Sequence, residues 1–520
     1  MTRKKPYSAF TELGLKQTLE GLKAEIKELY LADDVPWIIG YSGGKDSTAV
    51  LQLTWMAIAE LPESQRSKTV HVISTDTMVE NPIVASWVTH SLDVMRASAA
   101  EMRMPLEPNR LTPTLENSFW VNLIGKGYPT PRHKFRWCTD RLKIQPSNTF
   151  INSVVKRSGE AILLLGSRKM ESSARSKVMK RHEKHRVRDR LSPNGNLPNT
   201  LVYTPIENWS NDDVWMFLMQ VKNPWGYNNK DLLTMYQGAS ADGECPLVVD
   251  SSSPSCGDSR FGCWVCTLVD KDKSMTAMIQ NDEEKEWMLP LLELRNSLDF
   301  RNFENASDRH LRDYRRMSGR MQLVNPEAVR GNTNDEVREI PGPYTQDARA
   351  EWLRKLLEAQ TWIRKTGPNE VSNIELITLA EMQEIRRIWV VDKHELEDVL
   401  PGVYEEATGE SYPGSRLDDN LMLGAEELQV LEEICDGERS HYEMIRELLS
   451  VERQQKMNSK RAGLFKQLER AVARHYFRNR EEALEHTIQN TRVLADAKDG
   501  RGIESTHEES CDSTVEQVQI

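Results

Sequence analysis

Short apolar segments alternate with helical ones over residues 35–225, and this alternation constrains the fold more than any other feature of the sequence. The apolar runs cover 35–41, 69–74, 161–166 and 201–206, and segments with helical spacing cover 47–59, 82–100, 114–125 and 211–222. Strands that alternate with helices form a largely parallel sheet with helices on both faces. We therefore expect one α/β domain over residues 35–225.

The rest of the chain falls into four regions by composition. Leucine and isoleucine residues at steps of three and four between residues 10 and 31 predict an amphipathic helix in a first region, 1–34. Residues 226–275 are rich in Gly, Ser, Pro, Asp and Cys and predict a small cysteine-bearing module. Residues 276–494 carry helical patterns, and the polar, acidic segment 495–520 is expected to be disordered.

Composition and charge exclude several classes of protein. No run of about 18 uncharged apolar residues occurs in the 520-residue chain, which argues against a helical membrane protein. The basic N-terminal residues precede no apolar segment, so we expect a cytoplasmic protein and no contact with membranes. Seven cysteines in such a protein favour metal or redox chemistry over disulfides.

Residues 42–47 read SGGKDS and connect the first predicted strand to a helix. Glycines let successive backbone N–H groups point into one concavity, and the N-terminal end of the helix adds positive potential. Lys45 adds a mobile positive charge, and Ser42 and Ser47 add hydroxyl groups. The pattern is neither a Walker loop nor GxGxxG, and it indicates an anion-binding turn. A glycine-rich turn without a ligand is the alternative.

The SGGKDS segment resembles the PP-loop of ATP pyrophosphatases and phosphoadenylylsulfate reductases, which share the adenine-nucleotide α-hydrolase fold. Further segments that agree are Ser74-Thr75-Asp76-Thr77 with Glu80-Asn81-Pro82, Gly166-Ser167-Arg168 with Glu171-Ser172 and Arg175, and Tyr203-Thr204-Pro205-Ile206 with Trp209 and Asp213-Val214-Trp215. The resemblance implies that ATP, with Mg²⁺, is bound by Ser42, Gly43, Gly44, Lys45, Asp46, Ser47, Asp76 and Gly166. It also implies catalytic roles for Lys45, Asp46, Arg168 and Arg175.

Two of these assignments have structural alternatives. Arg168 and Arg175 lie seven residues apart, which is two turns on one face if the segment is helical. Their guanidinium groups suit phosphate or sulfonate oxygens, although a solvated basic surface is also possible. Asp76 follows the second strand, at the edge where parallel sheets bind ligands, but it could instead cap a helix.

Four clustered cysteines, Cys245, Cys256, Cys263 and Cys266, form a second candidate site. Thiolates so close together repel one another unless a cation or cluster neutralises them, and four cysteines suit structural zinc or a [4Fe–4S] cluster. The segment around Cys138 and the Cys263-x-x-Cys266 pair resemble the two cluster-binding segments of assimilatory adenylylsulfate reductases. This resemblance favours an iron–sulfur cluster.

The sequence departs from those reductases at Cys138, where they have two adjacent cysteines. We therefore expect the four clustered cysteines to hold the cluster and Cys138 to act as a sulfur carrier or nucleophile. Its thiolate would be favoured by Arg136 and Arg141 if those lie close. A cluster ligand and a buried, inert thiol are the alternatives for Cys138, and no chemical role is expected for Cys435 or Cys511.

Basic residues gather in two segments of a chain whose net charge is -11. Residues 168–190 contain ten Lys and Arg against three Asp and Glu, and residues 453–480 contain nine against one, with Phe465, Tyr476 and Phe477 among them. Such density attracts a phosphate backbone. A basic helix surface or an acidic protein partner is the alternative for either segment.

The sequence RFGCWVCT at 260–267, with DKDKSM at 270–275 and the helical C-terminal region, resembles the DndC-type sulfurtransferases of bacterial DNA phosphorothioation systems over nearly the whole chain. The resemblance implies adenylylation of a DNA phosphate oxygen with release of pyrophosphate, then attack by a sulfur nucleophile and departure of AMP. It implies double-stranded DNA as substrate, a cysteine desulfurase as the source of a persulfide, which the cluster or Cys138 accepts, and DndD- and DndE-type proteins as partner subunits.

Three other functions remain open from the sequence. A phosphoadenylylsulfate or adenylylsulfate reductase would need neither ATP nor DNA and would leave the helical half without a use. A tRNA thiolase would share the ATP and sulfur chemistry but act on RNA bases. A zinc-stapled DNA-binding scaffold would not convert ATP to AMP.

Overall fold

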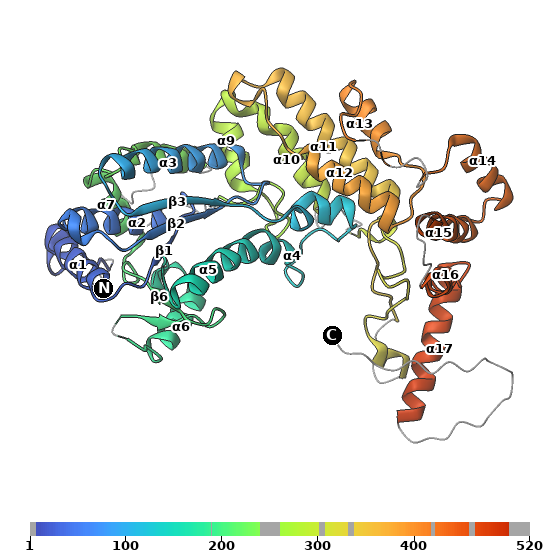
Figure 1. Cartoon of the computed structure of the whole chain (residues 1–520), viewed down its shortest axis with the longest axis horizontal. Coiled ribbons are helices and arrows are strands. Elements are labelled where there is room, and N and C mark those ends of the chain that lie inside the picture. Colours follow the sequence, from blue (N-terminus) through green and yellow to red (C-terminus); the bar gives the residue numbers. More distant parts are fainter. Residues whose placement is uncertain are drawn as a thin grey trace, which may run out of the picture. The chain divides into compact units, whose positions relative to one another are not determined.

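The computed structural model describes residues 7–188, 190–239, 261–300, 307–330, 337–415, 417, 422–456 and 463–498. By internal contacts the chain divides into two compact units. Unit 1 comprises Met1–Ser307, Arg349–Arg386 and Val399–Ser415; unit 2 comprises Asp308–Ala348, Arg387–Asp398 and Arg416–Ile520. Figure 1 labels their helices and strands.

Unit 1 contains a six-stranded sheet in the part of the chain that the structure describes. Its strands are β1 (Trp37–Gly40), β2 (Val70–Thr75), β3 (Leu106–Leu111), β4 (Ala161–Leu164), β5 (Ser192–Pro193) and β6 (Thr200–Tyr203), in the spatial order β3-β2-β1-β4-β6-β5. All neighbours are parallel except β5 and β6. The strand order reverses between β1 and β4, which is where α/β sheets open a crevice for ligands.

Apolar side chains alternate between the two faces of this sheet. Ile39 and Leu164 belong to a core shared with helices α1, α2, α3 and α7, whereas Ile38 packs in a second core with Ile151 and Val154 of α5. Figure 1 shows α1, α2, α3 and α7 on one side of the strands and α5 on the other. Burial on both faces explains why the central strands are apolar throughout.

The helices of unit 1 range from the three residues of α4 to the 20 residues of α3. They are α1 (Gly14–Leu31), α2 (Lys45–Ala59), α3 (Pro82–Glu101), α4 (Trp137–Thr139), α5 (Gln145–Ser158), α6 (Ser173–Glu183), α7 (Asn211–Gln220), α8 (Asn229–Gly238), α9 (Lys273–Asn281), α10 (Leu289–Leu298) and α13 (Leu400–Thr408). Most of α11 (Gln346–Thr366) and α12 (Leu379–Arg387) also belong to this unit.

The predicted fold class, a mainly parallel sheet with helices and a helical C-terminal half, is confirmed. Strand β3 was not predicted, because its sequence LEPNRL is polar and contains a proline, as an edge strand allows. The helix predicted over 114–125 is a 3-10 turn at Leu115–Asn117 followed by a π-helical segment, Val121–Gly125. The regional boundaries remain predictions.

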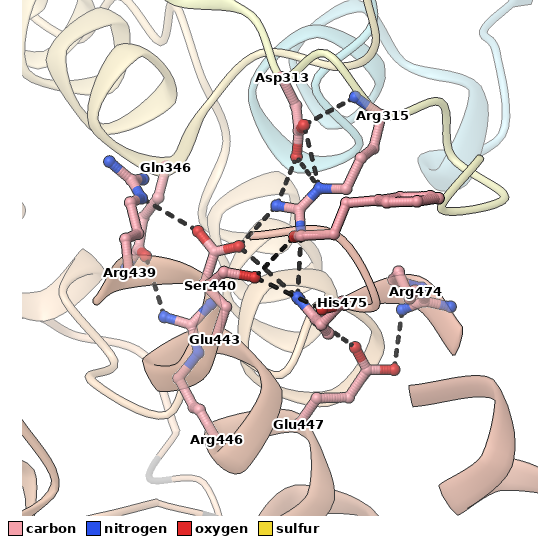
Figure 2. A network of polar contacts seen from close by, with 11 residues as sticks. Asp313, Arg315, Gln346, Arg439, Ser440, Glu443, Arg446, Glu447, Arg474 and His475 are labelled. Carbon is pink, nitrogen blue, oxygen red and sulfur yellow. Dashed lines mark hydrogen bonds and ion pairs between the residues drawn. The ribbon is translucent and has the colours of Figure 1, made fainter. Parts of the chain in front are cut away.

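Unit 2 contains the helices α14 (Ala425–Ile434), α15 (Arg439–Lys456), α16 (Leu464–Arg474) and α17 (Arg480–Lys498). A polar network joins three of its segments (Figure 2): Arg315 contacts Asp313 and Glu443, and His475 contacts Arg315 and Glu447. Because a guanidinium group only donates, Nδ1 of His475 accepts from Arg315, and Nε2 carries the hydrogen that it donates to Glu447 over 3.0 Å.

The carboxylates of this network are stabilised in their charged form. Burial alone would raise the pKa of Glu447, but its bond to His475 and the charge of Arg474 hold that pKa below its ordinary value. Burial would also raise the pKa of Glu443, but the Arg315 guanidinium outweighs this effect, so that pKa is lowered. The network therefore fixes α15 and its neighbouring segments through charged hydrogen bonds as well as apolar contacts.

None of the helices in the described residues combines the length and the apolar character that crossing a lipid bilayer requires.

Candidate active site

The loop at residues 42–47 lies between the carboxyl end of β1 and the start of α2, at the point where the strand order reverses. Gly43 has φ +72°, and a Cβ there would lie 2.4 Å from Cγ2 of Val88 on α3. Gly44, the residue before α2, caps that helix without a side-chain hydrogen bond. The Lys45 N–H donates to the Tyr236 hydroxyl over 3.4 Å, and the next N–H groups of α2 lie at a turn without a side-chain cap, which suits an anion.

Hydrogen bonds within the loop hold its shape. The Ser47 hydroxyl donates to the Gly44 carbonyl over 3.0 Å and lies 3.1 Å from Oγ of Ser42. The Ser42 N–H donates to the Ser47 hydroxyl over 3.2 Å. Trp87 Nε1 donates to the Gly43 carbonyl over 3.3 Å. In this structure Ser47 therefore stabilises the loop from within, whereas we expected its hydroxyl to face a ligand.

Gly166 follows β4 and brings that strand's end against the 42–47 loop. A Cβ at this position would lie 2.8 Å from the backbone C and O atoms of Asp46 and 3.0 Å from the Ser47 nitrogen. Such contacts are too short for any side chain, and backbone atoms have little freedom to move away. The close approach explains physically why glycine occupies this position.

Arg168 and Asp46 form a buried ion pair beside the loop. Arg168 is 4% exposed, and its Nε donates to Oδ1 of Asp46 over 2.7 Å. Nζ of Lys45 lies 3.5 Å from Oδ2 of Asp46 and 5.3 Å from the centre of the Tyr236 ring. Asp46 thus holds two cations at the mouth of the anion-binding turn.

The loop opens into a cleft of about 1410 Å³ in unit 1. Five cations line it, namely Lys45, Arg110, Lys143, Arg168 and Arg175, together with the carboxylates Asp46, Asp76, Glu80, Glu171 and Asp212. Every one of these cations has a carboxylate partner within ion-pair distance. A bound polyphosphate would therefore exchange carboxylate partners for phosphate oxygens at several of these positions.

Asp76 lies in the cleft and does not cap a helix. Its Oδ1 accepts from the Met78 N–H over 2.9 Å, and its Oδ2 accepts from Arg110 over 2.5 Å. Asn81 caps helix α3 instead. Asp212, at the start of α7, has a buried Oδ1 without a hydrogen-bond partner, and burial raises the pKa of its carboxyl group. Sequence reasoning missed Asp212, Arg110 and Tyr236.

Arg168 and Arg175 both line the cleft, but they do not share a helix face. Arg168 has an extended backbone before a 3-10 turn, whereas Arg175 lies in the first turn of α6 and pairs with Glu171. The condition for a shared face, a helix that includes both residues, is not met, because Ser172 caps α6 after Arg168 and accepts a hydrogen bond from the Arg175 N–H. The two residues reach the same cleft from different local structures.

The cysteine loop, defined here as residues 261–270, contacts the segment that follows β2. The Trp264 N–H donates to the Val79 carbonyl over 2.9 Å, and the Cys266 N–H donates to the Cys263 carbonyl over 3.0 Å. Sγ of Cys263 lies 3.2 Å from the Thr77 hydroxyl, which also donates to Glu80 over 3.2 Å. Because Glu80 lines the cleft, the cysteine loop adjoins one wall of this cleft.

Lys143 lies at this junction. Its Nζ is 3.4 Å from Oε1 of Glu80, and the charges of Cys263 and Glu80 raise the pKa of Lys143 despite its burial. In return, burial raises the pKa of the Cys263 thiol to about 12, although the Lys143 ammonium opposes this. A thiolate at Cys263 would thus require further positive charge, such as a metal ion or cluster supplies.

Cys138 is half-buried and close enough to Cys266 for the two thiols to interact electrostatically. Burial raises the pKa of Cys138, and a thiolate at Cys266 raises it further. Arg136 instead contacts His133, and Arg141 contacts the side chains of Asn117, Asn122 and Tyr128. The expectation that these arginines favour the Cys138 thiolate is therefore wrong for this structure.

Arg295 of α10 is a further residue that the sequence did not reveal. It is fully buried, and its guanidinium group donates to the carbonyls of Cys266, Val269 and Asp270 and pairs with Asp299. Three carbonyls of one loop thus converge on one charged group. Arg295 fixes the chain directly after Cys266.

Of the remaining cysteines, one lies at the end of a described helix and the others lie outside the described residues. Cys245, Cys256 and Cys511 lie outside the described residues, and Cys435 is buried at the end of α14. Within the described ranges no three His, Cys, Asp or Glu side chains are arranged to hold a metal ion. The assignment of the four clustered cysteines to a cluster stays a prediction.

Residues 36–268 match the phosphoadenosine phosphosulfate reductase domain. The chain therefore contains a domain similar to phosphoadenosine phosphosulfate reductases, with the 42–47 loop directly after its strand β1. This match covers the six strands, most of the residues that line the cleft, and residues 261–268 of the cysteine loop.

Two individual proteins are similar to parts of this chain. The uncharacterized protein MJ0066 of Methanocaldococcus jannaschii is 26% identical over 200 residues, which are 38% of this chain and about a third (35%) of that protein. The structure of the U34-tRNA thiolase NcsA from Methanococcus maripaludis with its [4Fe-4S] cluster aligns with 55% of this chain and 80% of its own, at 14% identity and a TM-score of 0.26.

Proposed function

We propose that this protein is an ATP-dependent sulfurtransferase that modifies a backbone phosphate of double-stranded DNA. A DNA phosphate oxygen attacks the α-phosphorus of ATP and releases pyrophosphate, which leaves the DNA phosphate joined to AMP. A sulfur nucleophile then attacks the DNA phosphorus, and AMP departs with the original oxygen. ATP would bind with Mg²⁺, with the pyrophosphate portion at the 42–47 loop, where uncapped N–H groups and Lys45 meet developing negative charge.

One observation carries this proposal. Glu80 and Lys143 line the same cleft as the 42–47 loop, and Glu80 reaches Cys263 through the Thr77 hydroxyl. A nucleotide site and a thiol site therefore share one wall, as a reaction that uses ATP to install sulfur requires. The resemblance to DndC-type proteins supports DNA as substrate and DndD- and DndE-type proteins as partners.

The sulfur would come from a persulfide supplied by a cysteine desulfurase, with Cys138 as its acceptor. The terminal sulfur of that persulfide forms the new bond to phosphorus. A second thiol then breaks the sulfur–sulfur bond and becomes part of a disulfide, leaving sulfur on the DNA phosphate. The position of Cys138 beside Cys266 supports this assignment, although its raised pKa means that the acceptor needs activation.

A [4Fe–4S] cluster would take two of its four ligands from the described residues. Cys263 and Cys266 would provide two ligands from one turn, with Cys245 and Cys256 as the others, and Cys138 is the alternative ligand. Such a cluster, when bound, would supply iron that can bind sulfide. Lys143 would compensate the negative charge of the thiolates, and Arg295 would hold the Cys266 carbonyl in place.

The products of ATP cleavage test the reaction directly. We expect labelled ATP, duplex DNA and a cysteine desulfurase with cysteine as the sulfur source to yield AMP and pyrophosphate in equal amounts, with sulfur in the DNA backbone. The match to the reductase domain favours phosphoadenylylsulfate reduction as a second candidate function. ADP as the nucleotide product would overturn the proposal, and sulfite release from phosphoadenylylsulfate without ATP would establish the second candidate.

Removal of one cysteine tests the cluster. We expect anaerobically purified protein to contain about four irons per chain and Cys263→Ser to lose them together, because a cluster with a missing ligand is released. Iron, acid-labile sulfide and the visible spectrum provide the measurement. Cys435→Ser, in α14, is the matched control and should keep the iron. One zinc per chain in colourless protein would contradict the assignment.

A further inference from the structure

Helix α6 carries four exposed cations on one side. Lys177, Lys180, Arg181 and Lys184 are spaced i, i+3, i+4 and i+7, starting within α6 and ending at the residue that follows its last turn. Residues with this spacing lie along one face of a helix. None of the four forms an ion pair with any residue that the structure describes. We call these four residues the α6 row.

The other basic residues of the 168–190 segment are mostly neutralised. Lys169 pairs with Glu183 and Glu207, and Arg188 pairs with Asp33 and Glu160. Arg186 and Arg190 also have carboxylate partners in unit 1. The strongly basic balance of this segment is therefore expressed at the surface mainly through the α6 row.

The α6 row leads away from the cleft. Ser172 and Arg175, at the N-terminal end of α6, line the cleft beside the 42–47 loop. At 1.5 Å per residue, the α6 row from Lys177 to Lys184 is about 10 Å long along the helix axis. At about 3.4 Å of axial rise per step, this length corresponds to about three steps along a DNA strand.

The side chains of α6 favour binding of a double-stranded over a single-stranded nucleic acid. Single-stranded nucleic acids are bound by cations interleaved with aromatic side chains that stack on unpaired bases. Helix α6, with the sequence SARSKVMKRHE, has no Phe, Tyr or Trp. Lysine and arginine without a stacking platform contact phosphates and leave paired bases untouched.

We propose that the α6 row binds the backbone phosphates that flank the reacting phosphate of a DNA duplex. This assignment rests on the proposed function and adds to it the surface that holds the substrate. The reacting phosphate enters the cleft, and its neighbours along the strand follow α6 outward. Binding is independent of base sequence at these positions, because only phosphates are contacted.

A quadruple variant tests this surface. We expect K177A/K180A/R181A/K184A to weaken binding of a fluorescent 30-base-pair DNA at least tenfold at low salt. The plot of log K against log salt concentration should become less steep by about 3 to 4, because roughly 0.9 counterions are released per neutralised phosphate. K16A/K156A/K222A/K230A removes four exposed lysines elsewhere in unit 1 and is the matched control, with affinity within threefold of the original protein.

Further arms separate the possible outcomes. Equal affinity of the two quadruple variants, or an unchanged salt dependence, would overturn the assignment. So would a larger loss for an RNA duplex or a single strand than for duplex DNA. Lys45→Ala should retain DNA binding, because the α6 row binds DNA independently of ATP cleavage. Failure of ATP cleavage in the original protein would therefore count against the proposed function alone. At saturating DNA, the α6-row variant should recover its rate of AMP formation.

Discussion

Replacement of Lys45 by alanine is expected to lower the rate of pyrophosphate release by about a hundred- to a thousandfold, the usual effect of removing one preorganised electrostatic contact. The Lys45 side chain lies at the start of α2, beside Asp46 and above the Tyr236 ring, where it can follow the departing pyrophosphate. The rate is measured at saturating ATP and duplex DNA, with pyrophosphate converted enzymatically to a coloured product.

The fold should survive this substitution. The Lys45 ammonium contacts one carboxylate, which also keeps its 2.7 Å bond to Arg168. We expect an unchanged circular dichroism spectrum and a melting temperature within a few degrees of the original value. Lys16→Ala, an exposed lysine of α1, controls for the loss of a charge. Pyrophosphate release within threefold of the original rate would exclude Lys45 from the reaction.

A methyl group at Gly166 is expected to weaken ATP binding at least tenfold, which corresponds to about 1.4 kcal/mol. The Cβ of Gly166→Ala would lie 2.8 Å from backbone atoms of Asp46, so the 42–47 loop or the end of β4 must move. Overpacking of this kind costs about 1–3 kcal/mol. Binding of a fluorescent ATP analogue gives the dissociation constant.

Gly195→Ala is the matched control for this experiment. Gly195 precedes Asn196, which lines the same cleft, and a Cβ on Gly195 would meet no atom within 4 Å. The control should bind ATP like the original protein. An unchanged dissociation constant for Gly166→Ala would mean that the loop does not hold the nucleotide in the shape seen here.

The parts of the fold that could be predicted from the sequence are those where one physical effect dominates. The central strands are buried on both faces, so their apolar runs identify them directly. Strand β3 is at the sheet edge, where polar residues are tolerated and the apolar signal disappears. The 42–47 loop could be predicted because its glycines and lysine follow a strand and open a helix.

The candidate site was predictable as a set of residues but not as a set of contacts. Motifs identified Asp46, Asp76 and Arg168, yet their pairing depends on tertiary contacts between residues as far apart as 46 and 168. Arg295 lies 29 residues after Cys266, with no motif to connect them, and only folding brings its guanidinium to that carbonyl. Likewise, the pKa of Cys138 follows from burial, which local charge in the sequence does not report.

The chain passes between units 1 and 2 five times, since each is assembled from three segments. Trp120 of unit 1, for example, donates to the Leu376 carbonyl over 2.7 Å, and Leu376 follows a long segment of unit 2. A single break near residue 307 would therefore take helices α11 to α13 away from the reductase-like domain and leave that tryptophan without its acceptor. Exchange of a whole unit by recombination would therefore need several crossover points instead of one.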